Sequence, residues 1–122
     1  MEPDILYTVE EKIIRIVYRG RAQFDITTDM LREINRLGTE SGIKSVLVDI
    51  SEAVDPDYHV NAIRHVEQSP SLGVDASYRL AILSTENDER LPYIETVASN
   101  RGLQLKCFTD ETDAIAWLLD QS

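Results

Sequence analysis

Two periodicities alternate along the chain, and each predicts one kind of element. Apolar residues at every second position, or in short unbroken runs, predict strands. Such runs occupy residues 5–9, 13–19, 45–50, 80–83 and 103–108. In the run at residues 13–19, Ile14, Ile16 and Tyr18 share one face, which we expect to be buried, while the opposite face is partly basic. The first two runs, separated by a polar break, predict a hairpin.

Apolar residues spaced three and four apart predict a first helix after Asp25 or Thr27, either of which can serve as its N-cap. We expect that helix to end at Gly38 or Gly42, because glycine readily adopts the left-handed backbone of a helix terminus. A loop over residues 51–54 then follows the third strand.

Three more helices follow from capping signals. Asp55 followed by Pro56 is a typical helix start, and this helix should stop before Pro70. Residues 87–88 are expected to cap the start of the next helix, which should end at Gly102. The last begins over residues 109–112 and buries Ala114, Ile115, Trp117 and Leu118.

The resulting order, β-β-α-β-α-β-α-β-α, predicts an α/β fold with a mixed, mostly parallel five-stranded sheet covered by four helices. The 122 residues suffice for one domain, so a single domain over residues 1–122 is expected. Ligands of such sheets usually bind beyond the carboxyl ends of the strands. Here those ends are residues 51–56, 84–88 and 109–110.

The amino-acid composition excludes or disfavours several classes of binding partner and site. A formal charge of −10 disfavours binding to nucleic acid or to an anionic membrane surface. The single cysteine excludes an intramolecular disulfide and a Cys-rich metal site. The start of the chain has no signal-peptide pattern, and no apolar run approaches the ~20 residues of a membrane span. We therefore expect a cytoplasmic protein without membrane insertion.

Acidic residues and histidines are the first candidates for chemistry. Asp49, Asp55 and Asp57 could hold a divalent cation, but Asp55 and Asp57 are more simply acids in the first turn of a helix. His59 and His65 are six positions apart and do not converge on one helix face. We therefore expect neither a metal nor another cofactor.

Nucleophiles and cations are the second candidates. Cys107 alternates with leucines on a buried strand face and is expected to be structural. No glycine-flanked serine elbow or glycine-rich phosphate loop is present, so we do not expect an enzyme. Arg15, Arg19 and Arg21 either line an anion site or form a solvated edge.

A predicted hairpin and helix precede the strand at residues 46–51, which leads through a loop into a helix. This arrangement resembles the STAS domain of anti-sigma-factor antagonists. The closing blocks at residues 93–102, 106–110 and 114–118 resemble more specifically its SpoIIAA-like bacterial branch, which is related in fold to CRAL-TRIO lipid carriers.

In the classical antagonists a serine at the helix start after this loop is phosphorylated by a partner kinase. The matching stretch here is Asp57, Tyr58, His59 and Val60, which keeps the aspartate but lacks the serine pair and the glycine. The resemblance thus implies a module without the usual phosphoacceptor. Its partner surface would include Ser51 and Asp55 together with Asp57, Tyr58 and His59.

Three functions remain as hypotheses. The first is a non-catalytic regulatory module that binds a protein partner, with a basic surface favoured by the acidic chain. The second is a carrier of a small apolar ligand or lipid, in a pocket lined by Val60, Ile63, Leu72, Leu91 and Ile94. The third is an enzyme that uses His59 with Asp55 or Asp57, although nothing beyond proximity in sequence orients or pairs these groups. The exposed edge of the hairpin could also support a homodimer.

Overall fold

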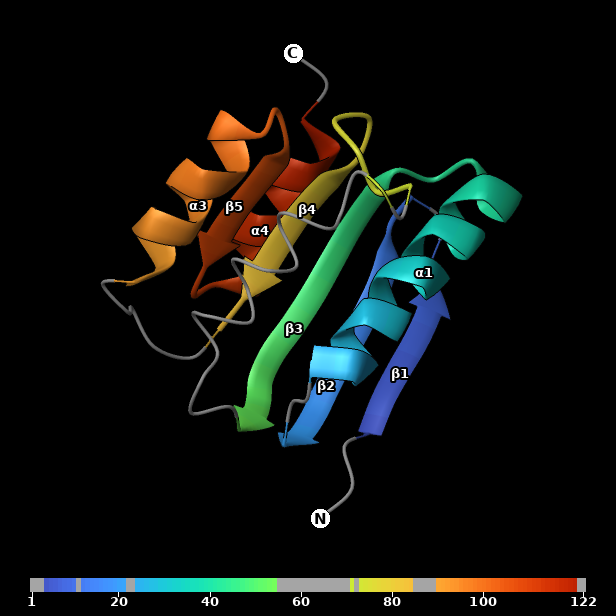
Figure 1. Ribbon diagram of the computed structural model, residues 1–122, viewed down its shortest axis with the longest axis horizontal. Helices are drawn as coiled ribbons and strands as arrows, with labels where there is room; N and C mark the ends of the chain where they lie inside the picture. The colour runs from blue at the N-terminus through green and yellow to red at the C-terminus, as the bar shows by residue number, and fades with distance from the viewer. Residues whose placement is uncertain are drawn as a thin grey trace.

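The computed structural model describes residues 4–10, 12–21, 24–54, 71, 73–84 and 90–120. Over these ranges the chain forms a five-stranded sheet and three helices (Figure 1). The strands are β1 (Asp4–Val9), β2 (Ile14–Arg21), β3 (Ser45–Val54), β4 (Arg79–Leu83) and β5 (Gln104–Phe108). The helices are α1 (Phe24–Ser41), α3 (Arg90–Asn100) and α4 (Glu111–Leu119). The helix predicted between Asp55 and Pro70 lies outside the described residues.

The strands lie in the order β1-β2-β3-β4-β5. The β1–β2 hairpin is antiparallel, and every other neighbouring pair is parallel. The mixed, mostly parallel sheet predicted from the sequence is therefore confirmed. Because β2 to β5 run in one direction, their carboxyl ends meet at one edge of the sheet. The outer strands, β1 and β5, each leave one side unpaired within the described sheet.

Helix α1 covers one face of the sheet (Figure 1). Leu31 and Ile34 of α1 pack into the same cluster as Ile14 and Ile16 of β2, and all four are at most 4% exposed. The alternation read from the second strand thus identifies its buried face correctly. Tyr78, just before β4, belongs to this cluster and is 1% exposed.

Helix α4 packs against the opposite face, where Ala114 and Leu118 join Leu47 and Ala81. Its first turn is capped by Asp110, whose Oδ1 accepts the backbone N–H of Thr112 at 2.7 Å. Arg79 of β4 supplies hydrogen-bond donors at the other end of α4. Arg79 Nη1 donates to the carbonyls of Trp117 and Asp120 at 2.6 and 2.7 Å. This cation therefore stabilises the helix terminus, where unpaired carbonyls concentrate negative charge.

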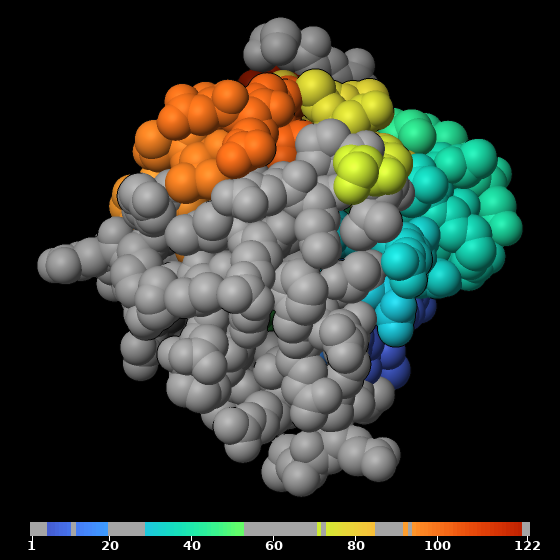
Figure 2. Space-filling model, viewed as in Figure 1, coloured from blue at the N-terminus to red at the C-terminus, as the bar shows by residue number. Residues whose placement is uncertain are grey.

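Helix α3 packs beside β5 through Ile94, Ala98 and Leu103, which form a cluster of their own. The turn between them uses Gly102, whose φ of 77° lies in the left-handed region. On the face shown in Figure 2, α1 and α3 occupy opposite sides. Because α4 lies behind the sheet, β5 has a helix on each of its two faces (Figure 1).

The limits of α1 differ from the prediction. The helix begins at Phe24, so Asp25 and Thr27 lie within its first turn instead of capping it. Gly38 lies inside the helix, and Gly42, with φ of 78°, follows its end. The sequence could not place Gly38, because its small size is needed by Tyr78, a residue distant in sequence that packs directly over it.

Strand β3 is longer than predicted, and the prediction of a loop over residues 51–54 is wrong because these residues belong to the strand. After a register shift between Val17 and Arg19, the end of β2 pairs with β3 as far as Arg21 and Val54. This parallel pairing supplies backbone hydrogen-bond partners that a loop would leave to water. Ser51 therefore lies in a strand of the sheet.

Candidate functional site

The described part of the carboxyl edge centres on the end of β3. Asp49 Oδ1 accepts two hydrogen bonds from Ser51, one from its backbone N–H at 2.9 Å and one from its hydroxyl at 2.6 Å. Both residues are half-buried. The carboxylate orients the serine hydroxyl, but in the described residues no imidazole or second base stands behind it to form a proton relay.

Two arginines of β2, Arg15 and Arg19, form ion pairs, and the side chain of Arg21 lies outside the described part of the structure. Arg19 Nε lies 2.7 Å from Glu52 Oε2 on β3. Arg15 pairs with both Glu10 and Glu111, and these carboxylates raise its pKa, with the hydrogen bond to Glu10 as the main cause. The guanidiniums of Arg15 and Arg19 are thus neutralised by acids of the same chain, which does not favour an anion site here.

Most of the predicted partner surface lies outside the described residues. That is the case for Asp55, Asp57, Tyr58 and His59, so only Ser51 of this set has a described position. Within the described ranges no three His, Cys, Asp or Glu side chains gather as metal ligands would.

The residues proposed for an apolar pocket are also mostly undescribed. Val60, Ile63 and Leu72 lie outside the described residues, and only the backbone of Leu91 is described. Ile94 is 2% exposed and packs against Ala98 and Leu103.

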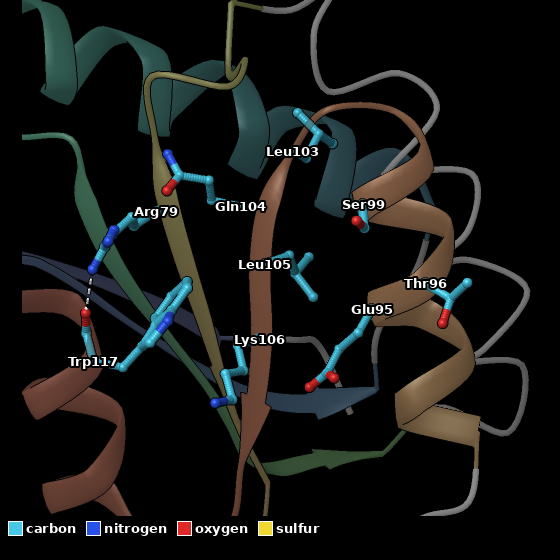
Figure 3. Close-up of a pocket in the computed structure, with 9 residues that line it drawn as sticks. All are labelled: Arg79, Glu95, Thr96, Ser99, Leu103, Gln104, Leu105, Lys106 and Trp117. Carbon is cyan, nitrogen blue, oxygen red and sulfur yellow. Dashed lines mark hydrogen bonds between the residues drawn. The ribbon is translucent and has the colours of Figure 1, made fainter. Parts of the chain in front are cut away.

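A different pocket, of about 430 Å³, opens beside β5 (Figure 3). The residues that line it come from four elements and the turn before β5, and we call it the β5 pocket. Helix α3 supplies one wall, and Arg79 and Trp117 stand on the other side of the strand. The lining residues are Arg79, Glu95, Thr96, Ser99, Leu103, Gln104, Leu105, Lys106 and Trp117.

Two cations stand over aromatic rings on the α4 side of this pocket. The Arg79 guanidinium carbon lies 5.2 Å from the centroid of the Trp117 ring. Lys106 Nζ lies 5.5 Å from the centroid of Phe108, and those two rings are themselves 5.9 Å apart. Such contacts hold a cation in place while leaving its hydrogen-bonding capacity largely open. Arg79 uses that capacity on α4, whereas Lys106 is exposed.

Glu95 reaches across from α3 to the outer edge of β5. Its Oε1 accepts the backbone N–H of Cys107 at 2.7 Å. Burial, reinforced by the negative charge of Glu95, raises the pKa of the Cys107 thiol to about 12. The thiol is therefore protonated at neutral pH, in agreement with the structural role predicted for it.

Sequence reasoning missed the β5 pocket because its walls are brought together from distant positions. Glu95 and Cys107 are 12 residues apart, and Arg79 and Trp117 are 38 apart. The one available signal was the alternation of the polar residues Gln104 and Lys106 with Leu105 along the last predicted strand. Among the described helices, none has both the length and the apolar character needed to cross a membrane.

Neither the models of known protein families nor the curated proteins include a match to this chain. Solved structures do match. An anti-sigma factor antagonist from Mycobacterium paratuberculosis superimposes with a TM-score of 0.64 at 11% identity, over 98% of this chain and 96% of that one.

Two further solved structures also match the fold of this chain. An uncharacterized protein from Shewanella loihica with a SpoIIAA-like fold gives a TM-score of 0.57 at 17% identity, over 95% and 93% of the two chains. The unphosphorylated antagonist SpoIIAA gives 0.57 at 9% identity, over 94% and 97%. At such identities the likeness is one of fold alone, and the fold of this chain is SpoIIAA-like.

Proposed function

We propose that this chain is a non-catalytic regulatory module that binds a protein partner at the carboxyl edge of its sheet. The observation that carries the proposal is the likeness in fold to an anti-sigma factor antagonist over 98% of this chain and 96% of that one. The surface would comprise the end of β3 around Ser51 and the segment that holds Asp55, Asp57, Tyr58 and His59.

The described side chains support binding over catalysis. The Ser51 hydroxyl donates a hydrogen bond to Asp49, which fixes its orientation, and among the described residues no imidazole stands behind that carboxylate. The Cys107 thiol, with a pKa of about 12, is not a nucleophile at neutral pH. A fixed polar surface of this kind is suited to recognition.

The charge of the chain indicates the chemistry of the partner. At −10 overall, the chain attracts a surface with exposed lysines and arginines, and long-range attraction of this kind mainly speeds association. Binding is therefore expected to weaken as ionic strength rises, because salt screens charges beyond about 8–10 Å.

Site-specific photocrosslinking tests the proposal. A benzophenone amino acid replaces Ser51 in one variant and Thr39 in the other, and both variants are irradiated in the native host. Thr39 is an exposed residue near the end of α1, which leads to the opposite edge of β3. It therefore serves as the matched control.

We expect a protein adduct of defined mass from position 51 that is absent from position 39 and is competed away by excess unmodified chain. No adduct at position 51, or the same adducts from both positions, would contradict a partner surface at the end of β3.

A further inference from the structure

We propose that β5 is a second recognition surface, at which an extended segment of a partner protein adds to the sheet as a new strand lying in the β5 pocket. This goes beyond the function proposed above, because it concerns another edge of the sheet and another mode of recognition. Strand addition supplies affinity through backbone hydrogen bonds and specificity through alternate side chains.

The backbone groups of β5 alternate in direction along the strand. In a parallel ladder, alternate residues direct both N–H and C=O to the same neighbouring strand. The Phe108 carbonyl accepts the N–H of Ser84, which follows β4, so Phe108, Lys106 and Gln104 face β4. Leu105 and Cys107 therefore direct their backbone groups away from the sheet.

This outer edge of β5 is only partly occupied. Glu95 accepts the N–H of Cys107 at 2.7 Å, and the Ala98 carbonyl accepts the N–H of Leu103 at 2.9 Å. Between them, both backbone groups of Leu105 face the pocket, and no contact to them lies within the described part of the chain. An edge with one donor and one acceptor available inside a pocket is a template for another strand.

The two walls of the β5 pocket differ in chemistry. Side chains of an added strand would alternate between the two faces of the sheet. On the α3 side they would meet Leu105, Thr96 and Ser99, which suit small or apolar residues. On the α4 side they would meet Gln104 and Lys106, and Lys106 favours an acidic residue. The matching segment alternates small apolar residues with acidic ones.

A second copy of this chain fits the same edge less well. Pairing of β5 with β5 would place the same side chains opposite one another and bring no acid to Lys106. Pairing of β5 with β1 of another copy is heterologous, and such contacts tend to build open filaments. The occupant is therefore a different protein.

The test begins with a displayed library of random decapeptides selected on the intact chain. The strongest binder is synthesised and titrated into ¹⁵N-labelled protein. We expect the largest amide shifts at Leu105 and neighbouring residues of β5. We also expect hydrogen exchange of the Leu105 amide to slow about fivefold, since a single net hydrogen bond contributes about 1 kcal/mol. N-methylation of the peptide amide that donates to the Leu105 carbonyl should weaken binding about fivefold for the same reason.

Charge recognition is tested with a matched pair of variants, Lys106→Glu and Lys12→Glu. Both replace an exposed lysine and change the net charge equally, but Lys12 lies in the β1–β2 connection, at the other outer strand. We expect Lys106→Glu to weaken an acidic binder about two- to fivefold, the range of an exposed ion pair, and Lys12→Glu to leave its affinity unchanged.

Three results would overturn the proposal: a library without binders, binding that shifts amides elsewhere, or affinity insensitive to N-methylation. None of these depends on the end of β3. A negative result here leaves the photocrosslinking test of the partner surface intact, and the reverse also holds.

Discussion

Replacing Gly38 by alanine tests how α1 is seated on the sheet. Gly38 lies inside α1 and is buried against the ring of Tyr78, the residue that leads into β4. A Cβ at position 38 would lie 2.9 Å from both Cε2 and Cζ of that ring, and closer still to its hydroxyl oxygen. Tyr78 is 1% exposed and its hydroxyl accepts from Lys44 Nζ at 3.2 Å, so the ring has little freedom to move aside.

Two opposing effects decide the outcome. Alanine is a better helix former than glycine by about 1 kcal/mol, which favours the variant. The contacts with the two ring carbons fall about 0.5 Å short of the 3.4 Å at which ordinary van der Waals distances begin, and the contact with the hydroxyl oxygen falls further short. Overpacking of a dense core costs about 1–3 kcal/mol, and rigid neighbours place this site at the upper end of that range. We expect a net loss of about 1–2 kcal/mol in the free energy of unfolding.

Urea denaturation followed by circular dichroism measures this change, provided the m-value stays constant. Gly42→Ala is the control: no atom lies within 4 Å of its Cβ, but its φ of +78° makes alanine strained, at a cost of about 1 kcal/mol. Adding Tyr78→Phe to Gly38→Ala removes the closest atom, so the double variant should be more stable than the sum of the single effects predicts. If Gly38→Ala raises the free energy of unfolding, helix propensity outweighs overpacking, and the close packing of Gly38 against the Tyr78 ring is wrong.

Three further predictions follow from single contacts. Asp110→Ala should lower the free energy of unfolding by about 1 kcal/mol, because it removes the N-cap of α4, whereas Asp110→Asn should retain most of it. Arg79→Met should cost about 1–3 kcal/mol, because two carbonyls at the end of α4 lose a charged donor. Cys107 should react with iodoacetamide at pH 8 at least about a hundredfold more slowly in the folded chain than in urea, because burial raises its pKa from 9.0 to about 12.

The same thiol makes stability depend on pH. The folded state keeps its proton up to about pH 12, whereas the unfolded thiol loses it near 9.0. The contribution of Cys107 is therefore complete below pH 9 and declines as pH rises from 9 toward 12. Urea denaturation across this window should show a flatter decline for Cys107→Ala than for the parent chain.

Each of these predictions is contradicted by a result of its own. Equal stability of Asp110→Ala and Asp110→Asn would show that the cap contributes nothing. An unchanged Arg79→Met variant would place the end of α4 away from β4. Equal alkylation rates for the folded and unfolded chains, or parallel pH profiles for Cys107→Ala and its parent, would show that the thiol is not buried.

Local signals were sufficient for much of the fold. The alternation of Ile14, Ile16 and Tyr18 identified the buried face of β2, because each strand residue sees a fixed side of the sheet. Asp110 acts at the start of α4 through its own side chain and Gly102 at the end of α3 through its own backbone, so their positions were readable from neighbouring residues.

Features set by partners distant in sequence were not readable. Strand β3 continues to Val54 only because β2, after its register shift, provides a pairing edge. Glu95 caps the N–H of Cys107 only because α3 and β5 pack side by side. The β5 pocket depends entirely on such contacts. Ser51 was named as a candidate from the sequence, but its bond to Asp49 required the strand conformation.

Native mass spectrometry of the chain purified from its own host, without detergent, tests the central claim most directly. The account predicts the mass of the polypeptide, either alone or with a stoichiometric protein partner. A small apolar molecule that is retained under native conditions and lost on denaturation would contradict it. That result would identify the chain as a ligand carrier with an internal cavity.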